Sequence, residues 1–247
     1  MRGPYIEQSR HPFEFQQLCV AVTDKTTEQA EALDGLIAGY VAGSLPAPVE
    51  VLVEAHLELN PRNRRWVGDL EAVAGSFLDR IEPVEMSGRD RLLADIYDLP
   101  PDGAPEFGLG SIAPAGAAAD DGGLPPSLRR FVGRSLDEVP WRTRLPGIRE
   151  WKIGSDEGFN TSLFILKAGH GLPPHTHRGT EMTLVLHGGF TDTTGHYGVG
   201  DVSIADEMID HKPVADDDGD CIGFVVSNAS LRLTGRLGRL LAPFLPD

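Results

Sequence analysis

Residues 169–188 constrain this chain more than any other stretch, because they set His175, His177 and Glu181 in a short window between two apolar runs. His175 and His177 are two residues apart, so on a strand their side chains point to the same face. On a helix they would lie about 200° apart, and the two prolines just before them disfavour a helix. Glu181 can return to the same point after the bend at residues 178–179. Imidazole nitrogens and a carboxylate oxygen suit a divalent ion such as Zn, Fe, Mn, Ni or Co.

This spacing resembles the first motif of the cupin family, in which a glycine, H-x-H, a glutamate and a second glycine follow one another at set intervals. This chain matches it with Gly169, His175, His177, Glu181 and Gly188. The second cupin motif has G, five residues, P-x-G, two residues, H, three residues, N. Gly200 and His211 fall in its register, whereas the Pro, Gly and Asn positions hold Asp206, Met208 and Ala215.

The cupin resemblance implies a fold and a ligand set. The fold is a double-stranded β-helix, an antiparallel barrel or sandwich. The implied metal ligands are His175, His177, Glu181 and His211. We expect zinc there before Fe, Mn, Ni or Co. The alternative is a metal-free cupin that uses the same four residues as structural polar groups.

The first hundred residues carry helical patterns. Apolar residues recur at three- and four-residue spacing over 28–42 and 48–59, and Gly43 lies where a helix C-cap belongs. A third run extends from Trp66 to Ile81, with Asn60 and Pro61 typical of an N-cap and a first helical residue. A shorter run covers 89–97, and Ser87 and Asp90 ahead of it resemble a capping pair.

The residue composition and the hydrophobic pattern change twice along the chain, so we predict an α+β multidomain protein. Residues 98–127 are rich in Pro, Gly, Ala and Asp, which predicts a flexible linker. From 128 to 247 short β-branched runs alternate with turn residues, which favours antiparallel strands over an α/β fold. The pattern does not assign residues 1–27, which fit either an N-terminal arm or a small edge strand, and 237–244 could form a short helix that packs on the barrel.

Net charge and cysteine content argue against several classes of protein. The net charge of −15 disfavours direct binding to nucleic acid or to anionic lipid, because both need a basic surface. Two cysteines give no disulfide framework, and we expect Cys19 and Cys221 to be apolar fillers. No stretch resembles a signal peptide or a membrane span, which favours the cytoplasm.

Segments in both halves of the chain resemble the ChrR-type anti-sigma factors, over roughly residues 28–245. The segments that carry the resemblance are residues 39–45, 55–57, 70–75, 131–134, 141–143, 177–186, 200–201 and 210–215. Proteins of this family pair a small zinc-binding helical domain, which masks a group-IV (ECF) sigma factor, with a C-terminal cupin. The resemblance therefore implies a helical anti-sigma domain at 28–97 and a cupin domain at 128–247.

One departure from that family concerns its helical zinc site. The family holds this zinc with an upstream histidine and an H-x-x-x-C-x-x-C cluster. Here His56 remains, Asn60 and Asn63 replace both cysteines, and Glu31 stands at the upstream histidine position. Asparagine is a poor zinc ligand beside a thiolate. We therefore expect no zinc at the N-terminal site, with Asn60 acting as an N-cap instead.

Two functions fit these patterns. In the first, the helical domain sequesters a sigma factor while the cupin metal senses a small molecule or an oxidant. In the second, the chain is a cupin metalloenzyme, for example a dioxygenase, and the helices only pack or dimerise. Three further histidines, His170, His187 and His196, fit a rim or surface position better than a ligand role. The oligomeric state stays open.

Overall fold

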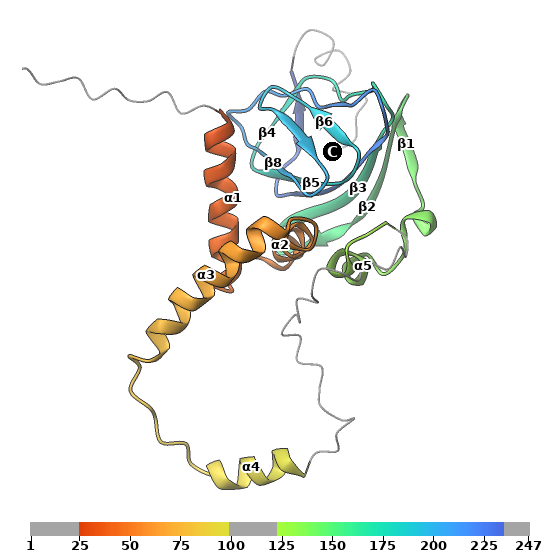
Figure 1. Cartoon of the computed structure of the whole chain (residues 1–247). Helices are drawn as coiled ribbons and strands as arrows, with labels where there is room; N and C mark the ends of the chain where they lie inside the picture. Colours follow the sequence, from red (N-terminus) through yellow and green to blue (C-terminus); the bar gives the residue numbers. More distant parts are fainter. Residues whose placement is uncertain (1–24, 99–122, 235–247) are drawn as a thin grey trace, which may run out of the picture.

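The computed structural model describes residues 25–98 and 123–234 (Figure 1). The first range holds four helices: α1 (Lys25–Val41), α2 (Ala47–Leu59), α3 (Pro61–Leu78) and α4 (Arg89–Tyr97). The predicted helical runs are confirmed, and their ends shift by a few residues. Asn60 caps α3 as predicted, because its side chain accepts a hydrogen bond from the Arg62 backbone N–H. The predicted capping pair Ser87 and Asp90 is wrong: Gly88 is the N-cap of α4 and no side chain caps this helix.

The second range is mostly antiparallel β structure, as the sequence predicts. A six-stranded sheet has the order β1-β2-β3-β10-β5-β8, a second sheet pairs β11 with β4, and a third has the order β7-β6-β9. The strands are β1 (Arg142–Leu145), β2 (Ile148–Asp156), β3 (Phe159–Leu166), β4 (His175–His177), β5 (Glu181–His187), β6 (Gly189–Thr191), β7 (His196–Gly198), β8 (Val202–Ala205), β9 (Val214–Ala215), β10 (Cys221–Ser227) and β11 (Leu231–Leu233).

A short helix precedes the strands and was not predicted. Helix α5 (Pro126–Val132) is followed by a 3-10 turn, η1 (Leu136–Glu138). Leu124 and Leu128 are buried, so ordered structure resumes before residue 128, where the sequence analysis placed the start of the cupin domain. The predictions for the N-terminal arm up to residue 24, for Cys19, for 99–122 and for a helix at 237–244 lie outside the described residues.

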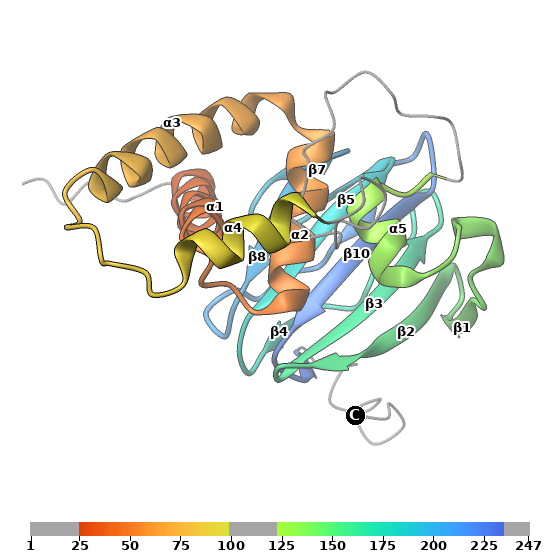
Figure 2. The ribbon, with the colours of Figure 1, turned by 90° about the horizontal axis from the view of Figure 1, so that it is seen from below.

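Two apolar cores lie on opposite faces of the large sheet. Inside the barrel, Val185, Phe190 and Cys221 belong to one buried cluster. On the outer face of the sheet, Leu184 and Phe224 belong to a larger cluster that also includes residues of α2 and α5. Figure 2 shows α2 and α5 lying across the outer face of β5, β10 and β3. The helical and β regions therefore share a continuous core.

Specific polar contacts also dock the helices on the sheet. Strand β8 is an edge of the six-stranded sheet. The Gln29 side chain of α1 donates to the Ile204 carbonyl at 2.6 Å and accepts from the Ile204 N–H at 2.8 Å, so it occupies both backbone groups of that edge residue. At the start of α2, the Ala47 N–H donates to a Glu157 carboxylate oxygen at 2.6 Å. The two Gln29 bonds cover backbone groups that the edge strand β8 would otherwise expose.

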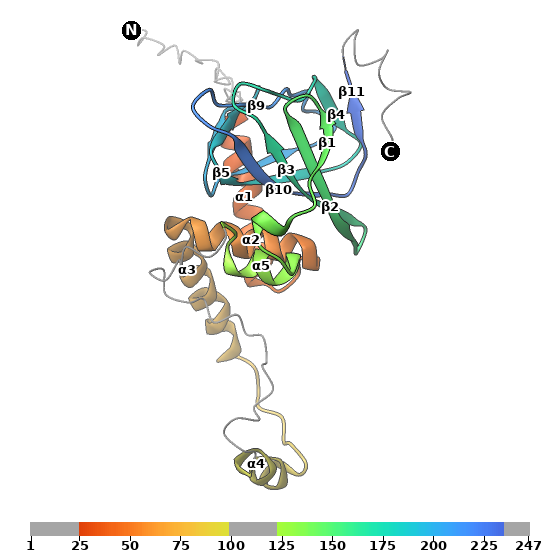
Figure 3. The same cartoon turned by 90° about the vertical axis from the view of Figure 1, so that its right-hand side faces the viewer.

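Helices α3 and α4 extend away from the barrel as an arm (Figures 1 and 3). Many of their large apolar side chains are exposed: Trp66, Val73, Phe77, Leu78, Leu92, Ile96 and Tyr97. In contrast, α1 buries Ile37 and packs its other apolar residues, including Leu33 and Leu36, against the cores. Within the described residues, no helix is long and apolar enough to span a membrane.

Candidate metal centre

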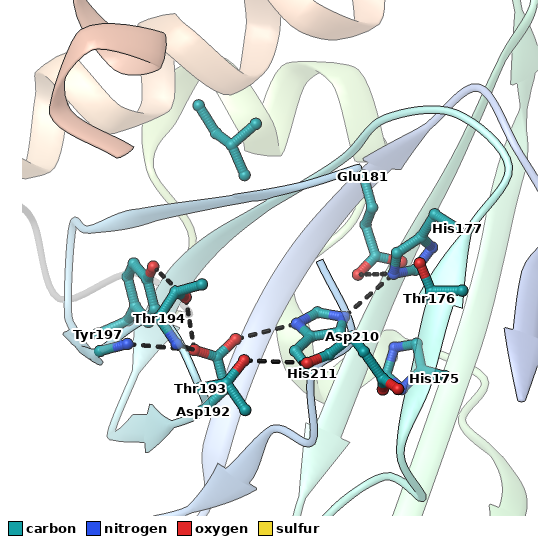
Figure 4. Close-up of polar contacts among 12 residues, drawn as sticks. His175, Thr176, His177, Glu181, Asp192, Thr193, Thr194, Tyr197, Asp210 and His211 are labelled. Atoms are coloured by element: carbon teal, nitrogen blue, oxygen red, sulfur yellow. Dashed lines mark hydrogen bonds and ion pairs between the residues drawn. The ribbon is translucent and has the colours of Figure 1, made fainter. Parts of the chain in front are cut away.

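Local backbone pairing brings the four predicted ligand residues together. Strand β4 carries His175 and His177 with both side chains buried, and β5 begins at Glu181. His211 lies opposite His175 in an isolated antiparallel bridge, in which each backbone N–H donates to the other residue's carbonyl at 2.9–3.0 Å. Figure 4 shows the four side chains pointing toward one another. Nearby strand pairings thus place residues from three separate segments at one point.

The ligand atoms converge closely enough to share one ion. One atom from each of the four side chains lies within 4.8 Å of all the others. His177 Nε2 is 3.1 Å from His211 Nε2 and 3.5 Å from Glu181 Oε1. Two nitrogens on a tetrahedral zinc ion, each about 2.0–2.1 Å from the metal, are separated by about 3.3 Å. The cluster could therefore hold a metal ion, and its His₃Glu composition suits a borderline divalent one.

In two of the histidines, a hydrogen bond at Nδ1 sets the tautomer of the ring. His175 Nδ1 lies 2.8 Å from the Pro173 carbonyl, and His211 Nδ1 lies 2.9 Å from Asp192 Oδ2. Both partners only accept, so each Nδ1 carries the proton and each Nε2 presents a lone pair to the cluster. His175 Nε2 is buried and has no hydrogen-bond partner among the described residues. A buried acceptor without a partner is costly, and a metal ion would satisfy it.

Burial also favours the uncharged forms of these groups. Burial, with the neighbouring His211 ring second, lowers the pKa of His175 to about 4, and burial with the other two rings lowers the pKa of His177 to about 3. Both imidazoles are thus neutral at pH 7, as metal ligation requires. Burial raises the pKa of Glu181 to about 7, although His211 acts in the opposite direction.

Asp192 completes the centre and was missed in the sequence analysis. Its side chain is fully buried. One oxygen accepts from His211, and the other accepts from the Thr194 N–H at 2.7 Å and the Thr194 hydroxyl at 2.6 Å. These hydrogen bonds hold the pKa of Asp192 below its usual value despite its burial. In the sequence, Asp192 precedes Thr-Thr-Gly, which indicates only a turn.

The altered second cupin motif still makes a turn. Asp206 stands at its proline position, and the Asp206 side chain accepts from the Met208 N–H at 2.8 Å. This bond from an aspartate to the backbone two residues on is an Asx-turn. The Ile209 N–H also donates to the Asp206 carbonyl at 3.2 Å. The turn therefore delivers His211 to the cluster without the family's Pro and Gly.

The other predicted polar residues lie outside the cluster. His170, His187 and His196 are exposed, which confirms their assignment to the surface. His196 Nε2 is hydrogen-bonded to Asp216 Oδ2 at 2.9 Å. Cys221 is buried, and its burial together with Asp216 raises the pKa of its thiol to about 12. This thiol is unreactive at neutral pH, because thiolate is the reactive form.

The fold and the cluster together define a cupin domain with a His₃Glu centre, joined to a helical unit. Residues 130–230 match the family model described as "ChrR Cupin-like domain". The chain is 35% identical to Anti-sigma-E factor ChrR of Cereibacter sphaeroides over 211 residues, which cover 85% of this chain and 95% of the relative. The chain belongs to the ChrR family of anti-sigma factors.

A solved structure supports the same relationship. In the crystal structure of Rhodobacter sphaeroides SigE in complex with the anti-sigma ChrR, the matched chain is 34% identical to this one with a TM-score of 0.63. The match covers 78% of this chain and 96% of that chain. The likeness therefore includes the helical unit as well as the cupin.

We predict that the protein binds about one divalent ion per chain through its cupin cluster. The double variant His175→Ala/His177→Ala should lose that ion, because it removes two of the four ligands. His196→Ala is the matched control, since His196 is exposed and lies outside the cluster. Elemental analysis after desalting measures the result. Equal metal content in the double variant and the wild type would contradict the assignment.

Asp192 should orient His211 for binding. We expect Asp192→Asn to weaken metal binding about 10- to 100-fold, the usual effect of removing such a carboxylate partner. Asparagine has one acceptor oxygen where the carboxylate has two, so it cannot accept both from His211 Nδ1 and from the Thr194 N–H. Asp216→Asn, beside the exposed His196, serves as the control. Competition with a chromogenic chelator measures the affinity, and wild-type affinity in Asp192→Asn would exclude the orienting role.

Metal binding should release a proton from Glu181 below neutral pH. With a pKa of about 7, this carboxyl is protonated at pH 6 in the metal-free protein and ionised at pH 8. Binding should thus release about one proton at pH 6 and almost none at pH 8, and apparent affinity should rise between these values. Calorimetry in buffers of different ionisation enthalpy counts the protons. Glu181→Gln should abolish the difference; if release from the wild type is the same at both pH values, Glu181 is not the source.

Proposed function

We propose that this chain is an anti-sigma factor that sequesters a group-IV (ECF) sigma factor in the cytoplasm. The observation that carries the proposal is its 35% identity, over most of its length, to an anti-sigma factor. A relative of similar identity has been crystallised in complex with SigE. The helical unit at 28–97 would contact the sigma factor, and the cupin at 128–247 would respond to a signal. The acidic net charge suits a partner that itself binds DNA through basic surfaces.

The arm formed by α3 and α4 is the surface best suited to such a partner. Phe77 is 56% exposed and Ile96 is 51% exposed, and both belong to a series of exposed apolar residues along the arm. Contiguous exposed apolar surface commonly marks a protein interaction site. An amphipathic helix with an uncovered apolar face fits against helices of a partner. Helices α1 and α2 are less available, because their apolar residues already pack in the cores.

The proposed sensor is the cupin centre, with a divalent ion, zinc before Fe, Mn, Ni or Co, as the responsive group. The support for this half is the chemistry of the described residues. The cysteines that the family carries in its helical domain are Asn60 and Asn63 here, and Cys221 is buried with a raised thiol pKa. An oxidant or small molecule would therefore act at the metal, where a coordination position not used by the protein could accept it.

The second candidate function is metalloenzyme catalysis at the same centre. It is favoured by one observation: a His₃Glu cluster can leave coordination positions for water or, on iron, for dioxygen. In that case the arm would serve packing or dimerisation. Sigma-factor binding distinguishes the two functions, because an enzyme has no need of it.

We predict that the full-length protein co-purifies with its cognate group-IV sigma factor when the two are co-expressed. Phe77→Asp and Ile96→Asp should each weaken the complex at least about tenfold, because a charge would be buried against an apolar contact. The matched control is Met208→Asp, which changes an apolar residue that is 84% exposed on the cupin. Binding is measured by titration calorimetry of purified proteins.

Two outcomes would count against the proposal. Failure of the wild-type protein to bind the sigma factor removes the regulatory function and leaves the enzyme as the candidate. Binding that survives both arm substitutions keeps the regulatory function but rejects the arm as the docking surface. Removing the metal from the full-length complex then tests the sensor: an unchanged affinity and an unchanged response to oxidant would reject a sensing role for the cupin.

A further inference from the structure

His56 lies where the family's pattern places a zinc ligand, yet its ring is fully engaged in hydrogen bonds. The residue is completely buried at the end of α2. Its Nδ1 is 2.6 Å from the carbonyl oxygen of Gly200, in the turn between β7 and β8. Its Nε2 is 2.8 Å from the Asn63 side-chain nitrogen on α3. One imidazole thus connects two helices to the cupin.

The partners determine the direction of each bond. A carbonyl oxygen only accepts, so His56 Nδ1 carries the proton and donates it to Gly200. The Nε2 atom of this tautomer has only a lone pair, which accepts from the Asn63 amide N–H. Burial lowers the pKa of His56, so the ring stays neutral at pH 7, as this arrangement requires. Asn63 therefore occupies the lone pair that a metal ion would need.

The remaining positions of the family's zinc pattern also do not fit a metal. Asn60 uses its side-chain oxygen to cap α3, accepting from the Arg62 N–H at 3.2 Å. Glu31, at the upstream histidine position, is exposed on α1. Among the described residues, the cupin cluster is the only group of three or more His, Cys, Asp or Glu side chains whose ligand atoms converge. The residues present do not form a zinc site here.

We propose that the helical unit of this chain is metal-free and that a relay of hydrogen bonds, Asn63–His56–Gly200, replaces the zinc. The relay fixes the corner between α2 and α3 through Asn63, as a metal bound to both helices would. In addition it fastens that corner to the cupin, through Gly200. The inference is independent of the proposed sigma-factor binding, because it concerns how the two regions of this chain are held together.

The structure around Gly200 fits such a fastening point. Gly200 is buried with φ +86°, a conformation that favours glycine. A Cβ atom there would lie 3.1 Å from Leu59 Cβ on α2, so the absence of a side chain permits the helix to approach. The Gly200 N–H donates to the Val185 carbonyl at 2.9 Å, and the Val185 N–H donates to Asp201. The relay therefore ends on β5, the strand that begins with Glu181.

The metal-free half of the proposal is tested with the full-length protein. Zinc content after saturation and desalting should be the same in the wild type, His56→Leu and Asn63→Ala, because none of them alters the cupin cluster. A loss of about one zinc per chain in His56→Leu or Asn63→Ala would overturn it. If His56→Leu does not fold, Asn63→Ala alone decides, since Asn63 is only partly buried on α3.

Two measurements test the relay itself: the tautomer of the His56 ring, and the rate of hydrogen exchange in the turn that contains Gly200. Long-range ¹H–¹⁵N spectra should show His56 as the Nδ1–H tautomer; an Nε2–H tautomer would overturn the assignment. Hydrogen exchange over residues 198–201 should be about 3- to 10-fold faster in His56→Leu and Asn63→Ala, as expected for the loss of one hydrogen bond. Arg65→Ala changes an exposed residue on α3, the helix that carries Asn63, and is the matched control. If both relay variants exchange at the wild-type rate, the relay is rejected and His56 contributes only by packing.

Discussion

Strand β5 is covered on both faces, by the barrel interior on one side and by helices on the other. Met182, Leu184 and Leu186 belong to the core shared with α2 and α5, whereas Val185 belongs to the barrel core. Because side chains alternate along a strand, Glu181 falls on the same face as Val185, toward the barrel interior. A slip of one residue in its pairing would carry Glu181 away from the histidines. The outer core therefore fixes the register on which the metal centre depends.

Three members of the cluster and most elements could be predicted from the sequence, because their signals are local; His211, 34 residues from His177, was found only through the register of the second cupin motif. His175 and His177 are separated by one residue, and the strand that they form gives this spacing its meaning. The Asn60–Pro61 start of α3 is likewise encoded by neighbouring residues. Asp192 and the relay through His56 could not be predicted, because their partners are 19 and 144 residues away. A contact at such separation leaves no periodicity in a single sequence.

Helix α5 shows a second limit of local patterns. It has only seven residues, and two prolines at its start resemble the end of the Pro-rich segment before it. Its stability depends on tertiary contacts, since an isolated helix of this length does not persist in water. Leu128 is fully buried in the shared core, and the carboxylate of Glu58 on α2 accepts from the Ser127 N–H and hydroxyl. Helix α2 thus supplies part of the apolar surface against which α5 packs and the acceptor for the Ser127 N–H in its first turn.

The shared core also limits how a signal could pass from the cupin to the helices. Moving α2 off the sheet would expose Val49, Leu52 and Ala55, and burial of each Val or Leu contributes about 1.5–3 kcal/mol. It would also break the bonds of His56 to Gly200 and of Gln29 to Ile204. A ligand shifts an equilibrium only by its differential affinity for the two states. A small shift of β5 and the Gly200 turn, passed to α2 and then to the exposed arm, requires less differential affinity than separation of the domains. Under the proposed function, the signal would therefore act through a docked helical unit, with the arm as the part that responds.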